Sequence, residues 1–180
     1  MRERLLEAAT ELFYAQGLRA VSVEKVIEKA ATTKVTFYRH FKSKDDLIVA
    51  YLGRRAQLER DGVDAAIAHG NGDVDATLRL IAEQIGMLAC APGFRGCPFI
   101  NAAAEYPDPE SAVRRVVDAH RDWYRSAFER LVSPLAPAHP GEAAEDLMLI
   151  RDGAMVAGYL DEPGTLAASF LRSGRAVVGL

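Results

Sequence analysis

The fold is decided by residues 22–52, SVEKVIEKAATTKVTFYRHFKSKDDLIVAYL. They predict two short helices separated by a tight turn, followed by a third helix with a strong start signal. In the middle helix only Phe37 and Phe41, four residues apart, give a buried helical face. The remaining positions carry hydroxyls, cations and a phenol. A short helix of this composition suits insertion into a groove of DNA.

Local signals place the helices on either side of this stretch. A first helix is predicted by four apolar residues at helical spacing, Leu5, Ala9, Leu12 and Phe13. Gly17 ends this helix. Ser22, Thr33 and Ser43 are the predicted N-caps of the next three helices, because a hydroxyl oxygen accepts from the free N–H groups of a helix start.

The segment 37–47, FYRHFKSKDDL, resembles the signature of the TetR/AcrR family of bacterial repressors. Residues 8–13, AATELF, followed by Gly17, are similar to the family's first helix. The resemblance covers residues 5–52, and beyond them it rests on length and helical character. Two departures stand out: residues 30–33, AATT, contain no glycine in the turn, and Val35 stands where the family often has a small residue. An alanine at a turn position that favours positive φ costs roughly 1 kcal/mol.

The resemblance also implies which side chains face DNA. Thr36 offers a methyl group or a hydroxyl to a base edge, and Lys34 reaches a guanine or a phosphate. His40 is interpreted as a phosphate contact or helix-end cap rather than a catalytic base, because no nucleophile or carboxylate shares its face. The full predicted set is Ser22, Thr33, Lys34, Val35, Thr36, Tyr38, His40 and Lys44. The alternative is a solvated polar helix within a bundle.

Composition excludes several classes of protein. The chain has 180 residues, 49% of them hydrophobic and 26% charged, as in ordinary globular proteins. No apolar run approaches the roughly 20 residues of a membrane span, and the N-terminus is amphipathic rather than signal-like, so we expect a cytoplasmic protein.

Residues 1–60 carry 12 basic and 8 acidic residues, a net +4, whereas the remaining 10 basic and 17 acidic residues give −7. A basic N-terminal region on an acidic remainder fits a module that binds a polyanion.

Every periodic segment beyond residue 43 is helical. We expect helices at about 44–68, 74–90, 98–106, 109–133, 142–159 and 163–178, with Asp108 capping the fourth and an extended loop around Pro134, Pro137 and Pro140. Residues 69–73 break the first of these helices. The predicted fold is therefore all-α: a three-helix helix-turn-helix head, residues 1–45, joined to a six-helix body for ligand binding and dimerisation, residues 46–180.

The body contains many aromatic residues with a few polar groups, which describes either a small-molecule cavity or a plain core. The resemblance favours a cavity for an apolar or aromatic effector, and the predicted lining is Met87, Phe94, Phe99, Asn101, Glu105, His120, Trp123 and Tyr124. Cys90 and Cys97 are interpreted as buried small residues or, alternatively, as a redox pair. We predict no metal and no cofactor.

The last two helices carry large apolar residues beside small ones, which completes the core of one chain or builds a symmetric four-helix interface. The resemblance implies a homodimer through residues 142–178. A dimer would place two recognition helices in successive major grooves, about 34 Å apart, on a near-palindromic operator. The sequence therefore predicts a ligand-released repressor. Alternatives are a thiol-responsive regulator using Cys90 and Cys97, a small helical enzyme using Glu105, His120 or Cys97, and a helical interaction module.

Overall fold

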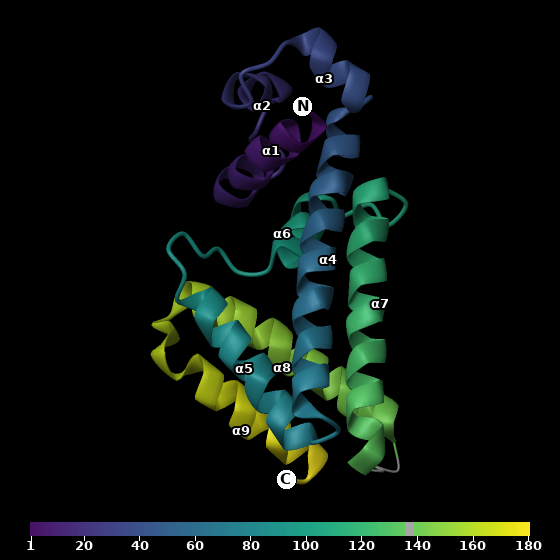
Figure 1. Cartoon of the computed structure of the whole chain (residues 1–180), viewed down its shortest axis with the longest axis vertical. Coiled ribbons are helices and arrows are strands. Elements are labelled where there is room, and N and C mark those ends of the chain that lie inside the picture. The colour runs from purple at the N-terminus through teal and green to yellow at the C-terminus, as the bar shows by residue number, and fades with distance from the viewer. Residues whose placement is uncertain (136–138) are drawn as a thin grey trace. The chain divides into compact units, whose positions relative to one another are not determined.

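A computed structural model of the chain describes residues 1–135 and 139–180, and every regular element within these ranges is helical (Figure 1). The predicted all-α fold is therefore confirmed. The α-helices are α1 (Arg2–Gln16), α2 (Val23–Lys29), α3 (Lys34–His40), α4 (Lys44–Gly70), α5 (Val74–Ala89), α6 (Pro98–Glu105), α7 (Ala112–Val132), α8 (Pro140–Leu160) and α9 (Leu166–Val178). Among the described residues, no helix combines the length and the apolar character that crossing a membrane requires.

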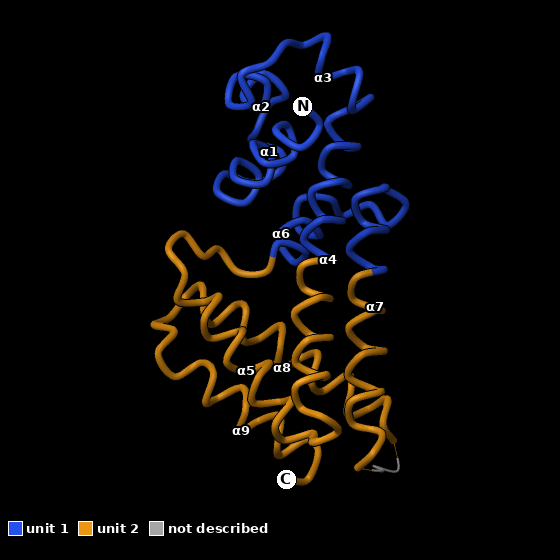
Figure 2. The backbone as a smooth tube through the Cα atoms, viewed as in Figure 1, with its two compact units in different colours: residues 1–57, 98–119 blue, residues 58–97, 120–180 orange. Residues whose placement is uncertain are grey.

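The chain forms two compact units (Figure 2). Unit 1 comprises residues 1–57 and 98–119, and unit 2 comprises residues 58–97 and 120–180. Unit 1 thus contains the first part of α4, α6 and the start of α7 in addition to the three helices of the head. The functional division between residues 45 and 46 stays a prediction.

Buried aromatic rings organise the core of unit 1. Phe13 of α1 and Tyr51 of α4 meet edge to face, with ring centroids 5.8 Å apart. Phe37 and Phe41 are both buried, with centroids 6.0 Å apart, as their spacing predicts. Helix α3 packs against α1 and α2, and it depends on this packing because it has too few turns to be stable without tertiary contacts.

The three predicted N-caps of the head are confirmed. The Ser22 hydroxyl accepts from the Lys25 N–H at 3.2 Å, and the Thr33 hydroxyl accepts from the Thr36 N–H at 3.2 Å. Ser43 accepts from the N–H of the third residue of α4 at 3.0 Å. Gly17 ends α1 with a φ of 92°, a conformation that side chains disfavour.

The predicted start of the long helix at residue 109, with Asp108 as cap, is wrong. Helix α7 begins at Ala112, and Ser111 is its cap, accepting from the Arg114 N–H at 3.1 Å. The Asp108 carboxylate instead accepts from the Glu110 N–H at 2.9 Å. A short acidic side chain that bonds two residues ahead forms a turn, which delays the helix.

The proline-rich segment before α8 also differs from the predicted extended loop. Pro134 lies in a short 3₁₀ helix, Ser133–Leu135, and Pro140 is the first residue of α8. Proline is well suited to the first helical turn, where its missing N–H costs nothing. Pro137 lies outside the described residues. The last predicted helix is divided into a 3₁₀ turn, Pro163–Thr165, and α9.

In unit 2, α9 packs against both α5 and α8. Small residues permit close approach of these helices: a Cβ atom added at Gly86 of α5 would lie 3.0 Å from the Ala167 Cβ of α9, and one added at Gly158 of α8 would lie 2.8 Å from the Ala89 Cβ of α5. Arg175 of α9 donates to both carboxylate oxygens of Asp75 on α5, at 2.5 and 2.8 Å. Close packing and an ion pair at the surface therefore stabilise the contact of α9 with the other helices of unit 2.

Candidate nucleic-acid interface

Helix α3 presents a polar and cationic outer side. Its inner anchor, Phe37, is inaccessible to solvent, whereas Val35 is 72% exposed and Tyr38 is 45% exposed. The other predicted DNA-facing residues near α3 are exposed apart from the half-buried Thr36: Thr33, Lys34 and His40. An exposed apolar residue next to hydroxyls and cations can contact thymine methyl groups, base edges and phosphates.

The start of α3 is organised by its own hydroxyls. The Thr33 and Thr36 oxygens lie 3.0 Å apart, and Thr33 also accepts from the Thr36 N–H. This arrangement leaves the Thr36 methyl group as the part of that residue best suited to a base contact. Ser22 combines the same capping role with an exposed position before α2.

Lys34 has a competing partner on the neighbouring helix. Its ammonium group lies 3.6 Å from the Glu24 carboxylate, and both side chains are about two-thirds exposed. Hydrogen bonds from the backbone lower the pKa of Glu24, and Lys34 contributes further to that lowering. Because an exposed ion pair is weak, a phosphate can replace Glu24 as the partner of Lys34.

Lys44 is half-buried and bonded within the head. Its ammonium group donates to the Arg19 carbonyl oxygen at 3.1 Å. Desolvation lowers the pKa of Lys44, although the nearby carboxylates oppose this effect. Lys44 therefore ties the start of α4 to the segment between α1 and α2.

Two exposed cations near α3 were not included in the predicted set. Arg39 follows Val35 by four residues and so shares its side of the helix, and Lys42 lies just beyond α3. The helical spacing from Val35 was the signal that could have identified Arg39. Ala31, in the turn before α3, has a φ of 46°, which confirms that this alanine occupies a left-handed position.

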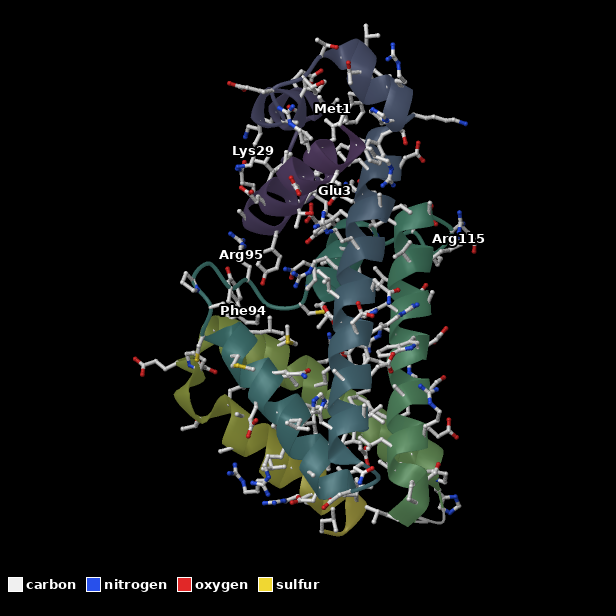
Figure 3. All side chains as sticks on the ribbon, viewed as in Figure 1. Met1, Glu3, Lys29, Phe94, Arg95 and Arg115 are labelled. Atoms are coloured by element: carbon white, nitrogen blue, oxygen red, sulfur yellow. The ribbon has the colours of Figure 1, made fainter. Side chains whose placement is uncertain are left out.

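The residues predicted to line an effector cavity are divided between the units. Phe99, Asn101 and Glu105 belong to unit 1, where Phe99 is buried and both carboxylate oxygens of Glu105 accept from backbone N–H groups. Met87 is 67% exposed on α5, and Phe94 lies in the segment after α5, where Figure 3 labels it.

Unit 2 brings together the three aromatic members of the set on α7. The His120 and Trp123 rings stack with centroids 6.4 Å apart, and Tyr124 meets each of them edge to face at 5.1 Å. His120 and Tyr124 are buried, whereas Trp123 is half-buried. This cluster, His120, Trp123 and Tyr124, is the part of the predicted lining that shares one location.

A buried charged group adjoins this cluster and was not predicted. Arg151 of α8 donates to a Glu59 carboxylate oxygen at 2.8 Å, and its guanidinium lies 4.5 Å from the Tyr124 ring centroid. The same Glu59 oxygen lies 3.2 Å from His120 Nε2 and accepts from the Tyr124 hydroxyl at 3.3 Å. Burial raises the pKa of Tyr124, so its hydroxyl remains a donor. Arg151 lies four residues from Leu147 and Met155, and this apolar register was the available signal.

Comparison with known proteins links both the head and the whole chain to a single family. A family model described as "Bacterial regulatory proteins, tetR family" matches residues 5–51. SCO4454, a TetR-family transcriptional regulator from Streptomyces coelicolor, is 40% identical with a TM-score of 0.91, and the match covers 99% of this chain and 94% of that one. A TetR-type regulator from Streptomyces avermitilis, sav143, is 26% identical with a TM-score of 0.83, covering 98% and 97% of the two chains.

One sequence relative matches only part of the chain. YvdT of Bacillus subtilis (strain 168), an uncharacterized HTH-type transcriptional regulator, is 30% identical over 82 residues. That alignment spans 46% of this chain and 42% of YvdT, so less than half of the relative is matched.

Proposed function

This chain belongs to the TetR family of bacterial transcriptional regulators, and we propose that it is a repressor released from a near-palindromic operator by a small apolar or aromatic molecule. Its activity is that of a DNA-binding transcriptional regulator. The observation that carries the proposal is the outer side of α3. Two buried aromatic residues anchor a short helix whose exposed residues are suited to the major groove.

We assign the DNA contacts to two groups. Val35 and Thr36 are proposed to contact base edges, because they occupy the first turn of α3. Lys34, in the same turn, is proposed to reach a guanine or a phosphate, and the salt dependence of binding decides between the two. The proposed phosphate contacts are Ser22, Thr33, Tyr38, His40 and Lys44.

Homodimers are typical of the family, and the exposed side of α8 supports an interface there. Leu149, Gly153, Val156 and Leu160 follow one another at intervals of four, three and four residues, which places them on one side of the helix. Leu149 is 68% exposed and Leu160 is 70% exposed in the single chain. We propose that the second copy covers this stripe. Residues 142–178 would then form a four-helix interface.

The effector is proposed to bind in unit 2 beside the cluster of His120, Trp123 and Tyr124. Aromatic surface next to a few polar groups suits an apolar or aromatic molecule. Trp123 is the only tryptophan, so its fluorescence reports on this location. An effector bound beside Trp123 should change its fluorescence over the same range of concentration in which operator affinity falls, because coupling between two binding sites is reciprocal.

A thiol-responsive regulator is a second candidate, supported by one contact. Both cysteines are free; Cys90 is exposed, so its interpretation as a buried small residue is wrong, whereas Cys97 is buried. The Cys97 sulfur lies 3.5 Å from a guanidinium nitrogen of Arg151. A cationic neighbour is one feature of reactive cysteines. Under this candidate, hydrogen peroxide would release the wild-type protein from DNA and would leave a Cys97→Ser variant bound.

Footprinting on the region upstream of the chain's own gene tests the proposal. We expect protection of two half-sites whose centres lie about one helical turn (~34 Å) apart. Addition of the effector should remove the protection. A protein that shows no sequence preference on this region, or that activates transcription from the protected site, would overturn the repressor assignment.

A further inference from the structure

The segment between α1 and α2 is held by a side chain that lies more than eighty residues further along the chain. The two carboxylate oxygens of Glu105, the last residue of α6, accept from consecutive N–H groups, those of Leu18 at 2.9 Å and Arg19 at 2.6 Å. All three residues belong to unit 1. A Cβ atom added at the preceding Gly17 would lie 3.2 Å from a Glu105 oxygen, so the backbone approaches this carboxylate closely.

Further contacts connect the same place to the start of α4. Arg19 lies over the Tyr106 ring, with its guanidinium carbon 5.5 Å from the ring centroid. The Tyr106 hydroxyl donates to the Asp45 carboxylate at 3.0 Å, and Lys44 donates to the Arg19 carbonyl oxygen at 3.1 Å. Glu105 and its neighbour Tyr106 therefore contact both the segment after α1 and the first turn of α4.

The hydrogen bonds of Glu105 and Tyr106 are strong for side chains that are only half-buried. Glu105 is half-buried, Leu18 is buried, and a carboxylate that accepts from two N–H groups makes charge-assisted hydrogen bonds. Burial and the bond to Asp45 raise the pKa of Tyr106 to about 12. The tyrosine hydroxyl is consequently a donor throughout the neutral range.

The contacts made by Glu105 and by Tyr106 have a functional consequence because of where they lie along the chain. Helices α2 and α3 lie between Arg19 and Asp45, so the bonds of Glu105 and Tyr106 act at the two ends of that segment. We propose that Glu105 and Tyr106 are positioning residues for DNA binding, which fix both ends of the helix-turn-helix segment so that α3 enters the groove in the correct orientation. This inference rests on DNA binding by the head, and it gives Glu105 a role other than effector binding.

The substitution Glu105→Gln tests the proposal, because its charge effect and its positioning effect have opposite signs. Removing a negative charge raises DNA affinity or leaves it unchanged. Loss of the paired bonds to Leu18 and Arg19 lowers affinity, by about tenfold for a lost charge-assisted bond. The matched control is Glu110→Gln, which removes the same charge from an exposed position in unit 1.

Operator affinity is measured by fluorescence anisotropy on the upstream duplex at several salt concentrations, well below the melting temperature of every variant. We expect Glu105→Gln to bind about tenfold more weakly with an unchanged salt slope, because no phosphate contact is lost. Hydrogen exchange at the Leu18 and Arg19 amides should accelerate in the same variant. A purely structural role would lower the melting temperature and leave the affinity of the folded protein unchanged.

Tyr106→Phe supplies a second test that preserves the ring under Arg19 and removes only the bond to Asp45. It should weaken operator binding by a smaller factor than Glu105→Gln. If Glu105→Gln does not fold, Tyr106→Phe decides the matter by its operator affinity relative to Glu110→Gln. The proposal is overturned if the variants that fold bind the operator as tightly as Glu110→Gln, whatever their exchange rates. Failure of the wild-type protein to bind the upstream duplex would instead contradict the proposed function.

Discussion

Ala31 is a non-glycine residue in the left-handed region, with a φ of 46° in the turn between α2 and α3. This conformation costs roughly 1–2 kcal/mol for a side-chain-bearing residue, and glycine avoids the cost while losing about 0.4–1 kcal/mol through its freer unfolded state. Ala31→Gly should therefore raise the free energy of unfolding by up to about 1 kcal/mol. Urea denaturation measures the change.

The adjacent alanine is the matched control. Ala30 is buried with a φ of −78°, an ordinary helical value, so glycine there brings no relief and only costs stability. Ala30→Gly should lower the free energy of unfolding while Ala31→Gly raises it. Equal destabilisation by both substitutions would show that the turn carries no strain.

Lys34 is expected to contribute one ionic contact to DNA. Lys34→Gln should reduce the slope of log affinity against log salt by about 0.9, the contribution of one neutralised phosphate, if its partner is a phosphate. An unchanged slope combined with altered preference at one operator position would assign Lys34 to a base instead. Anisotropy titrations across a salt series measure both quantities.

Glu24 provides the comparison for Lys34. Because the Glu24 carboxylate lies 3.6 Å from the Lys34 ammonium, Glu24→Gln frees the cation without removing it. We therefore expect Glu24→Gln to raise operator affinity modestly. A loss of affinity in this variant would mean that the ion pair orients Lys34 for binding.

At the scale of elements, helix boundaries were predictable where the signal is local. Ser22, Thr33 and Ser43 each bond to an N–H three residues ahead, so the sequence alone identifies these helix starts. The start of α7 was misplaced because Asp108 and Ser111 both have the chemistry of a cap. Only the three-dimensional path of the turn decides between them.

The contacts within the candidate sites, in contrast, could not be predicted from local sequence signals. Glu105 bonds to residues 86 and 87 positions away, and Arg151 bonds to Glu59 across 92 positions. Hydrophobic periodicity carries no information about such partners, because it reports only which side of one helix is buried. Periodicity did predict the outer residues of α3, because their exposure follows from the position of Phe37 within a single helix.

The ion pair between α5 and α9 predicts a pH dependence of stability. Hydrogen bonding from Arg175, supported by Arg79, lowers the pKa of Asp75 to about 2. A carboxyl group whose pKa is lower in the folded state contributes stability above its unfolded pKa of about 3.9, and this contribution is lost as the pH falls towards 2. Asp75→Asn should therefore destabilise the protein at neutral pH and flatten the decline below pH 4.

Urea midpoints measured from about pH 5 down to about pH 2 provide the check. The control is Asp64→Asn, which removes an exposed carboxylate from α4 within unit 2. We expect the control to retain the wild-type pH profile. Identical profiles for Asp75→Asn and the wild-type protein would show that the pair with Arg175 does not fasten α9 to α5.

At the scale of the whole molecule, the prediction concerns whether the protein is a monomer or a dimer. Val156 of α8 is 46% exposed in the single chain, so glutamate at this position can remain hydrated in a monomer. In the proposed dimer the same charge would be buried without a partner, which is costly. Val156→Glu should therefore weaken dimerisation roughly 100-fold or more, a loss of about 3 kcal/mol. Sedimentation should detect a folded monomer.

Two further variants separate an interface effect from a folding defect. Ala154 is buried within its own chain, so Ala154→Glu should lower the melting temperature whatever the number of chains. Ser126 is exposed on α7, outside the α8 stripe, and Ser126→Glu should leave a folded dimer. The Val156→Glu monomer should also bind the operator weakly, because one head contacts only one half-site of the near-palindrome. A Val156→Glu protein that remains dimeric with wild-type operator affinity would exclude α8 as the interface.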